Sequence, residues 1–90
     1  MAEGLAGRRK RALFRSLRRG TKESDMVLGG FAKAHVETLT ETQLDRYEAL
    51  LERNDNELLS WIGGWEPVPP DYDHDVMALL KRFKLAQRST

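Results

Sequence analysis

The stretch RSLRRGTKESDMVLGGF, residues 15–31, decides how this chain folds, because a basic helical pattern ends within it and an apolar one begins. Gly20 lies at the break, where a residue without Cβ can adopt φ > 0 and let another surface approach the backbone. Arg19 and Glu23 place opposite charges on either side of this glycine. The short charged break therefore predicts a contact surface rather than a reaction centre.

The composition is that of an ordinary globular protein. Ninety residues suffice for one small domain, and 40% hydrophobic with 32% charged residues is typical of a chain that folds. The sequence has no cysteine, which excludes disulfides, and no run approaches the roughly 18 apolar residues of a membrane span. We therefore expect no direct membrane insertion and a cytoplasmic location, and Glu3 in the arginine-rich N-terminus makes a mitochondrial transit peptide the less favoured interpretation.

The charges are distributed unevenly. Residues 1–22 contain eight basic residues and one acidic residue, a net charge of +7, whereas the remainder carries −6. Two interpretations are open: steering toward an acidic partner, or a basic helix packed against acidic helices of its own chain. A small basic nucleic-acid-binding or regulatory protein is the alternative function, but the third predicted helix is acidic and would repel phosphate.

Hydrophobic spacings of three and four residues predict an all-α fold, a compact bundle of five short helices with no strand. The expected helices span about 8–19, 24–38, 40–53, 55–62 and 73–86. They form a single helical domain, 8–86, between disordered ends at 1–7 and 87–90. The pattern TETQ at 40–43 predicts a capping box at the start of the third helix.

The first helix is expected to turn Leu13, Phe14 and Leu17 inward and its arginines outward. The pair Gly29 and Gly30, inside the second helix, predicts close helix packing.

The second half of the chain contains candidate helix caps and a proline-rich loop. Asn54 suits a left-handed position, with Asp55 as the cap of the fourth helix. Either Asp71 or Asp73 is expected to cap the fifth helix. Trp65, beside the prolines, is expected to fasten their loop to the bundle.

No constellation of catalytic residues is evident in the sequence. The carboxylates fall on solvent-facing helix positions, and no glycine-rich phosphate loop is present. His35 and His74 lack the spacing of metal ligands, and His35 fits a core or boundary position better than a metal site. We expect a protein that is not an enzyme and has no metal site.

The segment RRGTKE at 18–23, followed by DMVLGGF at 25–31, resembles the small flavinylation factors of succinate dehydrogenase, which carry an R-G-x-x-E motif. The similarity continues through Y-E-x-L-L-E at 47–52 and covers about residues 8–83. Thr21 and Lys22 depart from the family's usual methionine and apolar or polar residue.

This resemblance implies a five-helix assembly factor that binds the flavoprotein subunit of succinate dehydrogenase, or of fumarate reductase. The factor would promote covalent attachment of FAD to that subunit and hold no tightly bound cofactor itself. We expect a monomer with no nucleic-acid partner. The expected partner-binding residues surround the break between the first two helices: Arg19, Gly20, Glu23, Arg15, Arg11 and Asp25. For Glu23, stabilisation of its own helix is the competing role.

Overall fold

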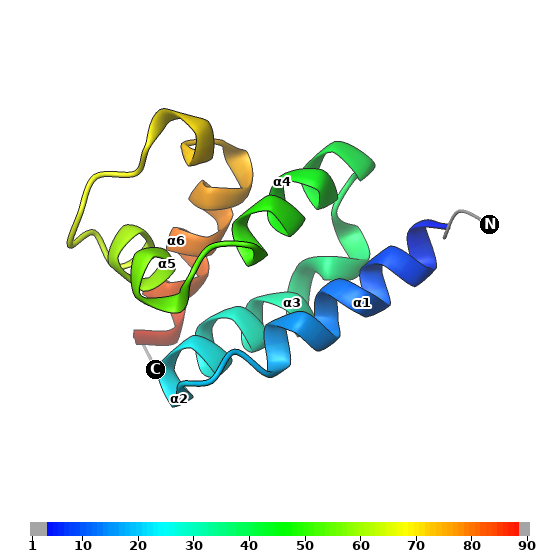
Figure 1. Ribbon diagram of the computed structural model, residues 1–90, viewed down its shortest axis with the longest axis horizontal. Coiled ribbons are helices and arrows are strands. Elements are labelled where there is room, and N and C mark those ends of the chain that lie inside the picture. The colour runs from blue at the N-terminus through cyan, green and yellow to red at the C-terminus, as the bar shows by residue number, and fades with distance from the viewer. Residues whose placement is uncertain (1–3, 89–90) are drawn as a thin grey trace.

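The computed structural model describes residues 4–88, and these form an all-α bundle without strands (Figure 1). The first half contains α1 (Leu5–Leu17), α2 (Lys22–Ser24), the π-helical turn η1 (Asp25–Gly29), α3 (Gly30–His35) and the 3-10 turn η2 (Val36–Thr38). The second half contains α4 (Glu41–Leu51), α5 (Asp55–Ile62), the 3-10 turn η3 (Pro70–Tyr72) and α6 (Asp75–Arg88). Because α2, η1, α3 and η2 follow one another directly, the five predicted helices are confirmed in order.

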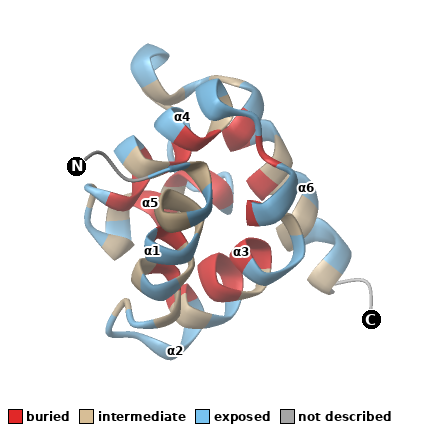
Figure 2. Ribbon diagram, turned by 90° about the vertical axis from the view of Figure 1, so that its right-hand side faces the viewer, coloured by how far each residue is buried: buried red, intermediate tan, exposed pale blue. Residues whose placement is uncertain are grey.

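The helices enclose one core. In Figure 1, α1 and the α2–α3 segment lie side by side along one edge, while α5 and α6 lie toward the end where the chain turns from α1 into α2. Buried residues line the inner sides of the helices (Figure 2). Phe31 lies near the centre, with its ring centroid 5.4 Å from that of Tyr47 and 5.9 Å from that of Phe83. His35 packs against Phe31 at 4.9 Å, at the half-buried boundary of this cluster.

The first helix differs from expectation in both extent and rotation. It begins at Leu5, so residues 5–7 are helical where a disordered end was expected, and residues 1–3 lie outside the described part. Ala12 and Ser16 are its buried residues, whereas Phe14 is 57% exposed. The inward prediction for Phe14 was wrong because α1 packs on η1 and α4 through small side chains, and the Ser16 hydroxyl lies 2.6 Å from that of Tyr47.

The glycine pair lets the second helix pack closely against both neighbours. A Cβ added at Gly29 would lie 3.1 Å from Leu17 Cδ2, and one at Gly30 would lie 3.1 Å from Phe83 Cζ. The π turn η1 ends at Gly29, and the backbone N–H of Gly30 then donates to the carbonyls of Met26 and Val27, four and three residues back. Close packing on α1 and α6 is thus confirmed.

Helix capping in the second half is partly as predicted. The capping box of α4 is present between Thr40 and Gln43. Asn54 is extended rather than left-handed, and its side chain caps α5 by accepting a hydrogen bond from Glu57 N at 2.8 Å. The last helix is capped by His74, whose Nδ1 accepts from Met77 N at 3.2 Å, rather than by Asp71 or Asp73.

The proline loop is fastened without the Trp65 side chain, which is 82% exposed. The backbone N–H of Trp65 donates to Ser60 O at 2.9 Å, and Tyr72 stacks on Trp61 with ring centroids 5.2 Å apart. These contacts replace the expected role of Trp65. At the C-terminal end α6 extends to Arg88, beyond the predicted end at Ala86, and residues 89–90 lie outside the described part.

Candidate partner-binding site

Gly20 forms an exposed turn between α1 and α2. Its φ of +112° lies in the region that L side chains rarely adopt. A Cβ added there would meet only Asp55 Oδ2, at 4.0 Å, so the space outside the turn is open. Thr21 then caps α2 by accepting a hydrogen bond from Ser24 N at 3.2 Å. The backbone here is accessible to another surface, as the sequence predicted.

Arg19 points into the molecule. Its side chain is 11% exposed, and its Nε donates to Asp55 Oδ1 at 2.8 Å. The other two guanidinium nitrogens donate to Leu51 O at 2.8 Å and Arg53 O at 2.7 Å, which satisfies carbonyls at the end of α4. Arg19 was predicted to contact a partner, but its guanidinium already makes hydrogen bonds within its own fold.

A second set of hydrogen bonds holds the turn from α2, η1 and α5. The backbone N–H of Arg19 donates to Asp25 Oδ1 at 2.7 Å, and Ser24 Oγ donates to Asp55 Oδ2 at 3.1 Å. Asp55 thus binds both sides of the Gly20 turn, and sequence reasoning treated it only as a helix cap. No local signal could have revealed this role, because Arg19 lies 36 residues away in the chain.

The remaining predicted residues lie on two surfaces. Glu23 is 64% exposed, with Lys84 Nζ of α6 at 3.4 Å from its Oε1. Arg15 is 33% exposed and pairs with Glu52 of α4 at 3.0 Å. Arg11 and Arg15 line a separate groove along α1 beside Phe14. The structure therefore gathers Gly20, Glu23 and Asp25 around the turn and places the two α1 arginines apart from it.

The basic helix also packs on acidic residues of its own chain. Arg8 pairs with Asp45 and Glu48 of α4, which raises the pKa of its guanidinium further above the usual range. Together with the Arg15–Glu52 pair, this supports the interpretation that part of the charge asymmetry is satisfied internally. The same contacts reduce the basic surface that a nucleic acid could use.

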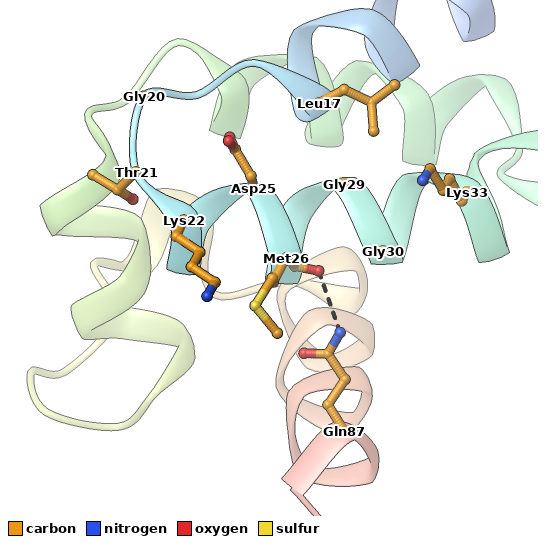
Figure 3. A pocket seen from close by; sticks show the side chains of 10 residues that line it. All are labelled: Leu17, Gly20, Thr21, Lys22, Asp25, Met26, Gly29, Gly30, Lys33 and Gln87. Carbon is orange, nitrogen blue, oxygen red and sulfur yellow. Dashed lines mark hydrogen bonds between the residues drawn. The ribbon is translucent and has the colours of Figure 1, made fainter.

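A groove of about 700 Å³ opens beside the Gly20 turn (Figure 3). Its floor is the α2–η1–α3 segment, with Leu17 of α1 on one side and Gln87 of α6 on the other. Met26 lies near its middle and is 57% exposed, while Lys22 and Lys33 lie on either side of Met26. Sequence reasoning missed Lys33 and Gln87 because they join the groove only through tertiary packing.

The described residues offer binding groups at this site. Within residues 4–88, no group of three or more His, Asp or Glu side chains is placed to hold a metal ion. Burial raises the pKa of Tyr47 to about 12, despite its hydrogen bond to Ser16, and its hydroxyl lies inside the core rather than in the groove. None of the helices in this part of the chain is long and apolar enough to span a membrane.

Known proteins resemble this chain over most of its length. A family model described as the flavinator of succinate dehydrogenase matches residues 10–84. The FAD assembly factor SdhE of Acetobacter pasteurianus is 42% identical over 69 residues, which cover 77% of this chain and 63% of that protein. The mitochondrial succinate dehydrogenase assembly factors 2 of Danio rerio and Dictyostelium discoideum are each 37% identical, covering 90% and 81% of this chain and 52% of each relative. The chain thus spans between about half and two thirds of the length of these relatives. It belongs to the family of succinate dehydrogenase flavinators.

Proposed function

We propose that this protein binds the flavoprotein subunit of succinate dehydrogenase, or of the related fumarate reductase, and promotes covalent attachment of FAD to that subunit. Family membership and the names of the relatives support this function. The structural observation that carries the site is the Gly20 turn, which is open on its outer side and held on its inner side by the contacts of Arg19.

The proposed mechanism is binding rather than bond making. The factor stabilises one arrangement of the client in which the flavin and the accepting histidine, both supplied by the client, meet productively. It holds no cofactor tightly, is not an enzyme, and acts as a monomer in the cytoplasm. Because the turn is fixed by several hydrogen bonds before the partner arrives, little conformational entropy is lost at the turn on binding.

The six predicted residues then divide by role. Gly20 and Glu23 contact the client directly, since both are exposed at the turn. Arg19 and Asp25 position the turn, because one side chain is buried against α4 and α5 and the other accepts the Arg19 N–H. Arg11 and Arg15 extend the contact along α1.

The test is a matched pair of glycine substitutions, Gly20→Ala and Gly64→Ala. Gly64 also has a positive φ, +80°, and open space around an added Cβ. Each substitution should reduce stability by about 1–3 kcal/mol through backbone strain. Only Gly20→Ala should lower FAD attachment to a co-expressed flavoprotein subunit, measured by in-gel flavin fluorescence. Glu23→Ala should lower attachment without changing the thermal melt.

Three outcomes would count against the proposal in different ways. If the wild-type chain does not raise flavin fluorescence of the subunit, the function itself is wrong. Full activity of Gly20→Ala would remove the turn from the site. Equal loss in both glycine variants would mean that reduced folding, rather than a lost contact, explains the result.

A further inference from the structure

The groove beside the Gly20 turn carries two lysines that are not used by the fold. Lys22 and Lys33 are exposed, and neither ammonium has a hydrogen-bond or ion-pair partner within residues 4–88. Figure 3 shows them on opposite sides of Met26. Most other basic side chains near this end have partners, such as Arg19 with Asp55 and Lys84 with Glu23. The two lysines therefore leave positive charge available at this surface.

An apolar patch separates the two charges. Met26 is 57% exposed, and it lies beside Leu17 and the backbone of the glycine pair. Its own carbonyl accepts a hydrogen bond from Gln87 Nε2 at 3.2 Å, so the π turn is tied to α6 beneath the exposed side chain. A flexible thioether at such a position adapts to the shape of an incoming apolar group.

Asp25 is the acidic residue that lines this groove. Its Oδ1 accepts the backbone N–H of Arg19 at 2.7 Å, and in Figure 3 its carboxylate points toward the Gly20 turn and away from Met26. The groove thus offers a lysine, an apolar centre and a second lysine, with the acid at one edge. This arrangement is complementary to carboxylates that flank an apolar side chain.

We propose that the groove binds an extended acidic segment of the partner protein, with one apolar side chain over Met26 and carboxylates beside Lys22 and Lys33. This inference rests on the proposed function, because it takes the groove to belong to the client interface. Eleven residues of helix separate the lysines by roughly 16 Å along the axis, which about five residues of extended chain span. The partner's carboxylates should therefore lie about four to six residues apart.

Other polyanions fit this surface less well. A nucleic acid carries closely and evenly spaced phosphates, which would place negative charge against Asp25 as well as against the lysines. An anionic membrane surface engages several exposed apolar side chains, whereas Met26 is the one strongly exposed large apolar side chain among the described residues that line this groove.

The experiment measures binding of the FAD-free flavoprotein subunit to the full chain by fluorescence anisotropy, over a range of salt concentrations. The variants are Lys22→Glu, Lys33→Glu and their combination, with Arg82→Glu as the control. Arg82 is also exposed, and reversing it changes the net charge equally, but it lines a different groove with His35 and Ala86. Each lysine reversal should raise Kd about tenfold, and the double variant should lose most of the salt dependence of binding. The Kd of the Arg82→Glu control should stay within about twofold of wild type.

Several results would overturn the inference while leaving the proposed function intact. One such result is that both lysine variants bind the subunit as tightly as wild type, while Gly20→Ala has lost FAD attachment. Another is equal weakening by Arg82→Glu, which would indicate nonspecific steering by net charge. Binding of the wild-type chain to phosphatidylglycerol vesicles or to a 20-base-pair duplex, lost in the double lysine variant, would assign the groove to a lipid surface or a nucleic acid. If the wild-type chain does not bind the subunit at all, the proposed function fails as well.

Discussion

Replacing Arg19 tests whether the Gly20 turn is held from inside. Arg19→Met keeps an unbranched side chain of similar length that can pack along the same path, but it removes the guanidinium and its bonds to Asp55, Leu51 and Arg53. The Asp55 carboxylate, 15% exposed, would then be left with Ser24 as its remaining side-chain donor. The variant therefore isolates the role of one buried charge.

The expected loss of stability is large for a chain of this size. Removing one partner of a buried ion pair typically costs about 3–5 kcal/mol. At 0.05–0.15 kcal/mol per residue, the whole chain should have a free energy of unfolding of roughly 5–13 kcal/mol. The substitution should therefore consume a substantial share of the total. Arg15→Met is the matched control, because the Arg15–Glu52 pair is far more exposed and should contribute only about 0–1 kcal/mol.

Urea unfolding followed by circular dichroism at 222 nm measures both variants. Combining Arg19→Met with Asp55→Asn should restore part of the lost stability, because the unpaired carboxylate is then neutralised. A loss for Arg19→Met no greater than that for Arg15→Met would refute the reasoning, since it would show that the guanidinium contributes no more than a surface charge. Strict additivity of the two substitutions would refute the coupling between Arg19 and Asp55.

Two further predictions concern pH. Burial raises the pKa of Tyr47 from 10 to about 12, so the stability that comes from burying the neutral phenol is fully present below pH 10 and is lost as pH rises toward 12. Over that range the free energy of unfolding of wild type, measured by urea titration, should fall by about 3 kcal/mol more than that of Tyr47→Phe. Parallel pH dependences of the two free energies would contradict this prediction. Desolvation and the nearby charge of Arg46 lower the pKa of His74 below 6.5. The neutral imidazole, whose Nδ1 accepts the Met77 N–H and caps α6, is therefore present above pH 6.5, and the cap is lost as pH falls through the lowered pKa. The protection factor of the Met77 amide, which is the intrinsic exchange rate at each pH divided by the observed rate, should therefore fall on acidification in wild type but not in His74→Asn. An equal fall in both proteins would remove His74 as the cause.

Local sequence patterns predicted the helices well because those patterns act over a few residues. The capping box at Thr40 and Gln43 is one example, since both partners lie within the same helical turn. The glycine pair was also interpreted correctly, because a Cβ at Gly29 would lie 3.1 Å from Leu17 Cδ2, which is tighter than an ordinary van der Waals contact.

The errors arose where distant parts of the chain decide the outcome. Phe14 was expected inside, but Ser16 occupies that face because its hydroxyl meets Tyr47, 31 residues away. Arg19 was expected to contact a partner, and the sequence did not indicate that its guanidinium also donates to Leu51 O and Arg53 O, which tertiary packing brings to it. Burial of a cation depends on such acceptors, and no sequence pattern near residue 19 indicates where they lie.

The two tryptophans, one buried and one exposed to solvent, give this chain two intrinsic fluorescence probes in different environments. Trp61 is 6% exposed and stacks on Tyr72, so its emission should shift to longer wavelength only when the bundle opens. Trp65 is 82% exposed, and a Cβ added at Gly63 would lie 2.6 Å from its indole Nε1, so that glycine leaves the ring room to rest there. Its fluorescence is accessible to dissolved quenchers while the chain is still folded. A quencher titration can therefore follow the loop and the core separately in the unlabelled protein.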